Sequence, residues 1–258
     1  MKTHPGIELA NITDVGCLRE RNEDSFAYWE PESDSEFLKR GRLAVVADGM
    51  GGYEGGQQAS QIAIATVCAV YQRDDGSDPQ TALRNGLRAA HDAILDYAAK
   101  HPEFYGMGTT CTAACIVGSR LYFAHVGDSR LYLVRGDSIT RLTRDHSYVA
   151  RLVESGLLHP AEAEHHPQRH VLTAALGVGA EPTTDTPPTA MELRKCDALL
   201  LCTDGLWGVL SDMEMQTIIT GNDPPAACRK LVDLAKQRGG PDNITMQLLH
   251  ITSNGTSG

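Results

Sequence analysis

Four aspartates stand beside apolar, strand-like runs or glycine-rich turns, and these carboxylates are the residues best suited to chemistry. They are Asp48, Asp128, Asp204 and Asp242. Asp48 follows the apolar run 43–47, and a strand ending there would aim its carboxylate from a rigid element. Gly49 comes next, and a glycine lets the backbone approach a ligand and can expose its main-chain carbonyl. The other three stand in similar settings, two after an apolar run and the last before one.

Such a set of carboxylates favours a hard divalent cation. Oxygen ligands, with almost no histidine or cysteine among them, select Mg²⁺ or Mn²⁺ over Zn²⁺ or Cu²⁺. Carboxylates gathered without a cation would repel one another and could not all stay ionised. Two such ions, about 3.5 to 4 Å apart and bridged by one carboxylate, activate a water and hold a phosphoryl group. The pattern therefore favours phosphate-ester hydrolysis, and the competing interpretation is that the aspartates only cap turns.

The overall charge narrows the choice of partner. Among 258 residues, 23 Lys and Arg face 33 Asp and Glu, which gives a net charge of −10. This balance argues against a nucleic-acid backbone or an anionic membrane as partner, and it is compatible with cation binding. No transmembrane candidate or secretory leader is predicted, and the seven cysteines form no Cys-x-x-Cys pair. We therefore expect a soluble cytoplasmic protein with reduced, mostly buried thiols.

Short runs rich in apolar and β-branched residues predict the strands that position the aspartates. The predicted strands are residues 7–14, 25–29, 43–47, 109–117, 121–126, 131–134, 138–142, 198–204 and 244–250. Those between 109 and 142 indicate one antiparallel meander, with a tight hairpin at Gly136 and Asp137.

Apolar residues at three- and four-residue spacings predict the helices. The predicted helices are residues 57–72, 79–100, 148–155, 211–220 and 225–238, the fourth opened by a capping box at Ser211 and Glu214. The acidic segment 30–40 is predicted to be a surface excursion. Because helices and strands come in separate blocks, the sequence favours an α+β layered domain with antiparallel sheets over a doubly wound fold.

One histidine-rich stretch lies outside this pattern. It carries His159, His165, His166 and His170. Their spacing matches no standard zinc-binding pattern, so a mobile surface flap is the preferred interpretation of this stretch.

Eight short stretches, which occur in this order and cover nearly the whole chain, carry a family resemblance. They are Arg19-x-x-Asn22-Glu23-Asp24, Val46-Ala47-Asp48-Gly49-Met50-Gly51-Gly52, Gly108-Thr109-Thr110, Val126-Gly127-Asp128-Ser129-Arg130, Leu142-Thr143-Arg144-Asp145-His146-Ser147, His166-Pro167-x-Arg169, Thr203-Asp204-Gly205 and Gly240-Pro241-Asp242-Asn243-Ile244-Thr245. Together they resemble the metal-dependent type 2C (PPM) serine/threonine protein phosphatases, most closely the bacterial branch.

The resemblance implies a fold. This is a four-layer α-β-β-α sandwich with two central antiparallel sheets, a metal-binding cleft between them, and a flap near residues 147–172. It also implies a single catalytic domain over residues 1–252, followed by a disordered tail at 253–258, and a monomeric protein.

The resemblance further implies the metal ligands. Asp48 would bridge two Mn²⁺ or Mg²⁺ ions, and the carbonyl of Gly49 would complete the shell of one. Asp204 and Asp242 would bind the other ion. Asp128, with Asp204, would hold a third and weaker one.

Other residues receive supporting roles from the same resemblance. Arg19 would hold the substrate phosphate, a task that suits its forked donors. Glu23 and Asp24 would act through metal-bound waters or as neighbours of the ligands, and Asn243 would support them. A metal-bridging hydroxide would attack phosphorus in line.

Two positions depart from the family pattern. Met50 stands where eukaryotic members carry a histidine proposed as the general acid, which leaves the proton donor unassigned. Ala174 replaces an arginine that many bacterial relatives have after the flap, which puts their flap contacts in doubt for this chain.

The implied function is hydrolysis of phosphoserine and phosphothreonine in proteins, opposing a bacterial Ser/Thr kinase in signalling. Alternatives are a catalytically weak phosphoprotein-binding regulator of the same fold and a phosphatase acting on other phosphoesters. A metal-dependent nuclease would need a basic groove, which the net charge opposes.

Overall fold

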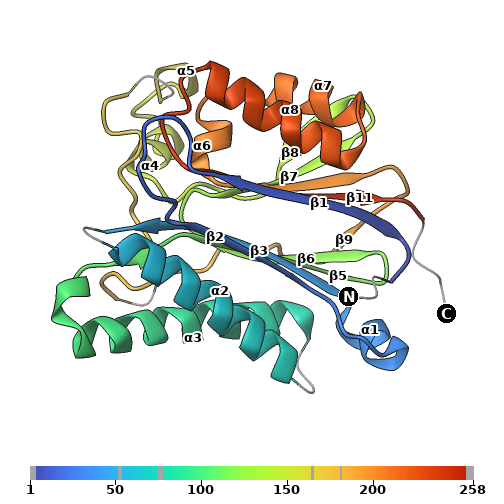
Figure 1. Ribbon diagram of the computed structural model, residues 1–258, viewed down its shortest axis with the longest axis horizontal. Coiled ribbons are helices and arrows are strands. Elements are labelled where there is room, and N and C mark those ends of the chain that lie inside the picture. The colour runs from blue at the N-terminus through green and yellow to red at the C-terminus, as the bar shows by residue number, and fades with distance from the viewer. Residues whose placement is uncertain (1–3, 52–53, 75–77, 164–165, 181, 254–258) are drawn as a thin grey trace.

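Two antiparallel sheets pack face to face, and helices cover their outer faces (Figure 1). The computed structural model describes residues 4–51, 54–74, 78–163, 166–180 and 182–253. One sheet has the strand order β1-β11-β10-β7-β8. The other has the order β2-β3-β5-β6-β9, with the short strand β4 paired to β3. The predicted four-layer α+β sandwich is confirmed.

The strands are β1 (Ile7–Asp14), β2 (Asp24–Trp29), β3 (Arg42–Met50), β4 (Gly108–Thr109), β5 (Cys111–Val117), β6 (Arg120–Val126), β7 (Arg130–Arg135), β8 (Ser138–Arg141), β9 (Met191–Glu192), β10 (Ala198–Cys202) and β11 (Ile244–Ile251). The helices are α1 (Asp34–Arg40), α2 (Gly55–Arg73), α3 (Pro79–Lys100), α4 (Tyr148–Glu154), α5 (Pro160–Ala163), α6 (Asp204–Trp207), α7 (Asp212–Thr220) and α8 (Pro224–Gln237). A 3₁₀ turn, η1 (Pro102–Phe104), follows α3.

Strand β3 shows how alternation of side chains builds the layers. Leu43 and Val45 are fully buried against α2 and α3. Ala44 and Val46 point to the opposite face and pack against the second sheet. Successive side chains of a strand face opposite ways, so an uninterrupted apolar run is what a strand covered on both faces requires. A third apolar cluster joins α7 and α8 to the outer face of the other sheet.

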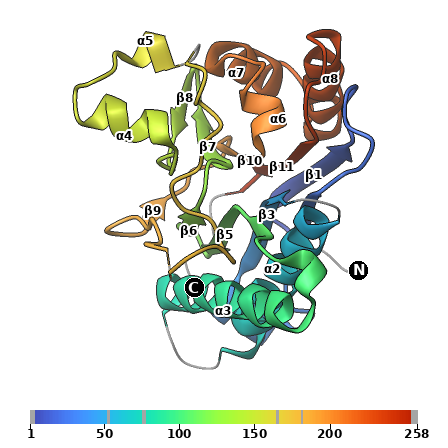
Figure 2. The same cartoon turned by 90° about the vertical axis from the view of Figure 1, so that its left-hand side faces the viewer.

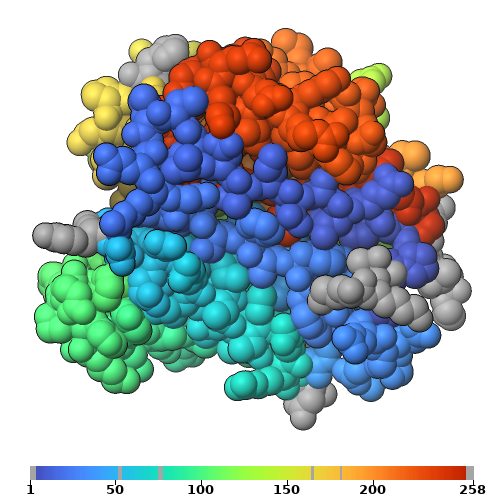
Figure 3. Space-filling view, in the orientation of Figure 1, coloured from blue at the N-terminus to red at the C-terminus, as the bar shows by residue number. Residues whose placement is uncertain are grey.

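Figure 2 turns the molecule so that one end of the sandwich faces the viewer, with α4 and α5 above and to one side of the α2–α3 pair. The loop after β1, the two flap helices and α6 lie together at this end. In the space-filling view, β1 and the residues after it run across the face between the two helical layers (Figure 3). Among the described residues no helix has the length and apolar composition needed to cross a membrane.

Several predicted element boundaries were wrong. The strand carrying Asp48 does not end before it, because β3 continues to Met50 and pairs there with β4. The supposed meander of residues 109–142 is divided between sheets, since β5 and β6 belong to one and β7 and β8 to the other. The chain changes sheet at residues 127–129, a segment that includes Asp128.

Several short elements were not predicted, among them α1, η1, α5, α6 and β9, and two predicted features lie outside the described residues. Segment 30–40 contains helix α1, which is capped by the Ser33 side chain accepting from the Glu36 amide. Strand β9 has only two residues, too few for a periodic pattern. The predicted tail beyond Ser253 lies outside the described residues, as does His165.

Candidate active site

Strand register places two carboxylates side by side, that of buried Asp24 and that of half-buried Asp48. Asp24 begins β2 and lies directly opposite Asp48 in the antiparallel β2–β3 pair. Side chains of directly opposed residues share one face, with Cβ atoms about 4.5 to 5.5 Å apart. Thr110 fixes the Asp48 backbone, because its Oγ1 accepts from the Asp48 N–H at 2.9 Å and its own N–H donates to the Asp48 carbonyl at 2.9 Å. The Gly-Thr-Thr stretch therefore holds the predicted bridging aspartate.

The second sheet brings two more of the predicted aspartates to the same place. Asp204 follows β10 and opens the short helix α6, and Asp242 lies just before β11. One link between the sheets at this site is Thr203, whose hydroxyl donates to Oδ2 of Asp24 at 2.8 Å. Its backbone N–H also donates to the Thr245 carbonyl at 3.0 Å. The site thus lies where the two sheets meet.

Gly49 is glycine because another segment of backbone passes against it. A Cβ at this position would lie 2.1 Å from the carbonyl oxygen of Gly56, at the start of α2. A Cβ on Gly56 would in turn lie 2.2 Å from Oε2 of Glu23. The first turn of α2 is therefore packed tightly against both Gly49 and Glu23, two of the predicted site residues.

Burial and neighbouring negative charges raise the pKa of Asp24, Asp48 and Asp128. Burial and the charges of the other aspartates raise the pKa of Asp48 well above its ordinary range. Burial, followed by the charges of Asp204 and Asp145, does the same for Asp128. Burial raises the pKa of Asp24 to about 7, with added contributions from Asp204 and Asp242. The carboxylates of Asp24, Asp48 and Asp128 therefore all lie close enough to Asp204 for its negative charge to act on them.

This donor set fits divalent cations. Oδ1 of Asp24 and Oδ1 of Asp204 are buried and have no hydrogen-bond partner among the described residues. Buried acceptors without partners are costly, and a cation would satisfy both the lone pairs and the charge. No three His, Cys, Asp or Glu side chains of the described residues stand close enough to hold an ion together. Hard cations commonly keep several waters, so they do not need such close protein ligands.

Arg19 and Asn243 occupy the rim of this region. The Arg19 guanidinium donates to Oδ2 of Asp242 at 2.8 Å, and 55% of its side chain is exposed. Asn243 accepts from the Glu23 N–H at 2.8 Å and donates to the carbonyls of Val15 and Arg21 at 3.0 and 2.9 Å. Asn243 thus ties down the loop that carries Arg19.

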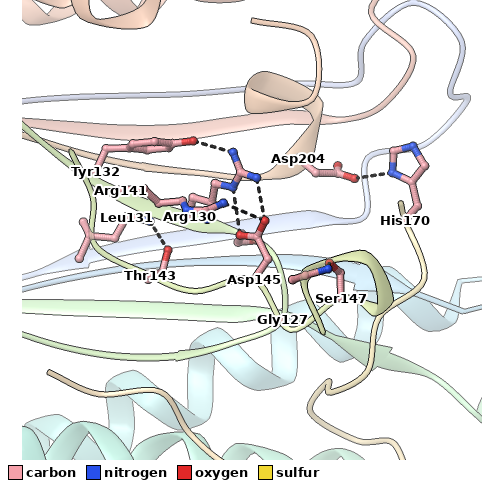
Figure 4. Close-up of polar contacts among 12 residues, drawn as sticks. Gly127, Arg130, Leu131, Tyr132, Arg141, Thr143, Asp145, Ser147, His170 and Asp204 are labelled. Carbon is pink, nitrogen blue, oxygen red and sulfur yellow. Dashed lines mark hydrogen bonds and ion pairs between the residues drawn. The ribbon is translucent and has the colours of Figure 1, made fainter. Parts of the chain in front are cut away.

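Arg130 forms a second network beside Asp128 that the sequence analysis did not single out (Figure 4). Its guanidinium makes two hydrogen bonds to Asp145, at 3.0 and 2.7 Å, and one to the Tyr132 hydroxyl at 2.8 Å. It also stacks over the Trp207 ring, 3.4 Å from the centroid. Helix α6, which carries Asp204, is thereby linked to the base of the flap. Arg130 and Asp145 were quoted within motifs, but their pairing had no signal in the sequence.

The described flap histidines, His159, His166 and His170, do not come together as a metal site. His170 was assigned only to a surface flap, yet the structure places its Nδ1 atom 3.5 Å from Oδ2 of Asp204. The rings of His159 and His166 accept from nearby backbone N–H groups within the flap instead. The sequence cue that could have indicated this contact is that His170 stands near the end of the flap, where the chain returns to the two sheets.

Met50 and Ala174 are the two positions at which the sequence departs from the family pattern. Met50 lies two residues after Asp48 in β3, and therefore on the same face of the strand. Ala174 lines a cavity of about 620 Å³ with Arg144, Arg151 and other residues from both sides of the flap base. An alanine carries no guanidinium, so the flap contact made by an arginine at this position is absent.

The chain was compared with known proteins. The family described as Protein phosphatase 2C matches residues 19–221. Serine/threonine protein phosphatase PstP of Mycobacterium tuberculosis is 37% identical over 241 residues, which are 93% of this chain but 44% of that protein. The chain therefore spans less than half the length of this relative.

Solved structures agree with the sequence comparison. Serine/threonine phosphatase Stp1 from Staphylococcus aureus superposes with a TM-score of 0.88 at 30% identity, covering 98% of each chain. The catalytic domain of PstP in complex with 2 manganese ions gives a TM-score of 0.81 at 34% identity, covering 96% of this chain and 99% of that one.

Proposed function

We propose that this chain, which belongs to the protein phosphatase 2C family, hydrolyses phosphoserine and phosphothreonine in proteins. The observation that carries the proposal is the group of aspartates that comes together from both sheets, with Arg19 at its rim. Relatives that match most of the chain are named serine/threonine phosphatases, and one related structure holds two manganese ions.

The aspartates are the residues that would hold the metal. Asp48 and the carbonyl of Gly49 would serve the first two Mn²⁺ or Mg²⁺ ions together with Asp204 and Asp242. Asp128 would share a third and weaker ion with Asp204. When bound, such ions supply an activated water for attack on phosphorus and neutralise charge on the phosphoryl oxygens.

The chain's own residues would bind and orient the substrate around these ions. Arg19 is exposed enough to leave Asp242 and donate two parallel hydrogen bonds to a phosphoryl group. Asp24 is held by Thr203 and, with Glu23, would accept hydrogen bonds from waters in the site. The Met50 thioether cannot donate a proton, so the leaving alkoxide would take its proton from another group.

A catalytically weak regulator of the same fold is disfavoured because none of the predicted ligands is replaced. A phosphatase that acts on small phosphoesters would use the same site. Comparing rates on phosphopeptides and on small phosphoesters would distinguish this function from protein dephosphorylation. We further propose that the substrates are phosphoproteins of a Ser/Thr kinase signalling system in the cytoplasm. The net charge of −10 opposes nucleic acid as substrate.

The test is phosphate release from a phosphothreonine peptide, with and without Mn²⁺. We expect release that depends on Mn²⁺ or Mg²⁺, stops with EDTA and is lost in Asp48→Asn. The matched control is Asp137→Asn, the same charge change at an exposed turn residue. Turnover by a chelated, metal-free sample would refute the proposal, as would no release from the metal-loaded protein.

A further inference from the structure

Among the described residues of the flap (147–172), His170 reaches one of the aspartates of the candidate site, Asp204. Its Nδ1 atom lies 3.5 Å from Oδ2 of Asp204, and the two side chains point toward each other (Figure 4). The Asp204 side chain is 14% exposed and that of His170 is 58% exposed. The contact therefore lies at the border between the buried carboxylates and solvent.

The two oxygens of Asp204 have different surroundings. Oδ2 faces His170, whereas Oδ1 is buried and has no hydrogen-bond partner among the described residues. A carboxylate whose one oxygen is held by a polar neighbour keeps the other in a defined direction. Polar neighbours that contact a metal-binding side chain, but not the metal, commonly orient that side chain.

The ring of His170 is itself oriented by the preceding residue in the chain. The Arg169 Nε–H donates to Nε2 of His170 at 2.9 Å. A neutral imidazole that accepts at Nε2 carries its hydrogen on Nδ1. This hydrogen-bond pattern therefore assigns the tautomer whose N–H faces Asp204.

The backbone beside His170 is anchored to the site. The Tyr148 N–H donates to the Val171 carbonyl at 2.8 Å, and the Thr173 N–H donates to the His146 carbonyl at 2.8 Å. The His146 N–H in turn donates to the Gly127 carbonyl at 2.7 Å, next to Asp128. Both ends of the flap thus meet at the sheet crossover, which keeps His170 near the carboxylates.

We propose that His170 is a positioning residue, which holds Oδ2 of Asp204 so that Oδ1 is presented to a divalent cation. The inference rests on the proposed function, because it assigns Asp204 to a metal. It adds a residue of the flap to the determinants of metal affinity. Loss of a partner outside the ligands typically weakens metal binding about 10- to 100-fold. Because this contact is long and partly exposed, we expect about tenfold.

The experiment is calorimetric titration of the full chain with Mn²⁺, using three substitutions of His170. In His170→Asn the amide nitrogen is two bonds from Cβ, as Nδ1 is, so the donor toward Asp204 is kept. In His170→Gln the amide nitrogen corresponds to Nε2, and in His170→Ala no donor remains. His159→Ala is the matched control, because it removes a flap histidine whose ring accepts from the Ala161 N–H within the flap.

We expect the Ala and Gln variants to raise the Kd for Mn²⁺ about tenfold, and the Asn variant and His159→Ala to stay within about threefold of the wild type. If His170 only supported the structure of the flap, the Asn and Gln variants would not differ in their Kd for Mn²⁺. The inference is overturned if all His170 variants bind like the wild type, if Asn is as weak as Ala, or if His159→Ala weakens binding equally. A wild-type protein that binds Mn²⁺ but releases no phosphate would instead refute the proposed function and leave these comparisons intact.

Discussion

Replacing Asp24 with Asn should stabilise the metal-free protein at pH 8. Asp24 is buried, its Oδ2 accepts from Thr203, and its Oδ1 has no hydrogen-bond partner in the described part of the chain. Burial, and then the charges of Asp204 and Asp242, raise its pKa from the ordinary 3.8 to about 7. An asparagine can still accept from Thr203 and removes the unfavourable charge.

The magnitude follows from the two pKa values of Asp24. Between about pH 4 and 7 the folded protein keeps a proton that the unfolded chain has lost, so the free energy of unfolding falls as pH rises. The pKa values differ by about three, and each pKa unit corresponds to about 1.4 kcal/mol, so ionised Asp24 costs about 4 kcal/mol at pH 8. Asp48 and Asp128, whose pKa is also raised by burial, act in the same direction.

The assay is thermal unfolding in EDTA at pH 5 and pH 8. Asp24→Asn should raise Tm at pH 8 by about 10 °C and much less at pH 5. Exposed Asp137→Asn is the control for the loss of one charge and should leave Tm unchanged. The reasoning is refuted if metal-free Asp24→Asn melts at or below the wild type at pH 8. It is equally refuted if the wild type gains stability from pH 5 to pH 8.

Three further substitutions test other parts of the site. Arg130→Ala should lower the free energy of unfolding by about 3 to 5 kcal/mol in urea titrations, because it leaves Asp145 without its buried bidentate partner and Trp207 without its stacked cation; a loss below about 1 kcal/mol would contradict this. Asp128→Ala should still bind two Mn²⁺ ions per chain, as measured by calorimetry, while phosphate release slows about tenfold or more. Loss of all bound Mn²⁺ would show that Asp128 does not serve a separate third ion. Met50→His should raise the ratio of kcat/KM for a phosphothreonine peptide over para-nitrophenyl phosphate, by up to about a hundredfold, because an alkoxide needs a proton donor more than a phenolate does. An unchanged ratio with intact metal binding would mean that the proton comes from elsewhere.

Local patterns were enough to predict most of the elements. The helix predicted for residues 79–100 has those bounds as α3, because an apolar stripe with a proline in its first turn depends only on neighbours along the chain. The capping box at Ser211 and Glu214 forms as predicted for the same reason. Boundaries failed where a distant strand intervened, as at Met50, which stays in β3 by pairing with Gly108.

Residue types and family resemblance were enough to identify the aspartates and Arg19 as a set. How these residues meet depends on the three-dimensional fold. The Asp24–Asp48 pairing depends on strand register, and the Thr203 hydroxyl reaches Asp24 from a segment 179 residues away in the chain. The contact of His170 with Asp204 likewise exists only because the flap is anchored at the sheet crossover. Such contacts depend on register and packing between distant segments, which local periodicity does not encode.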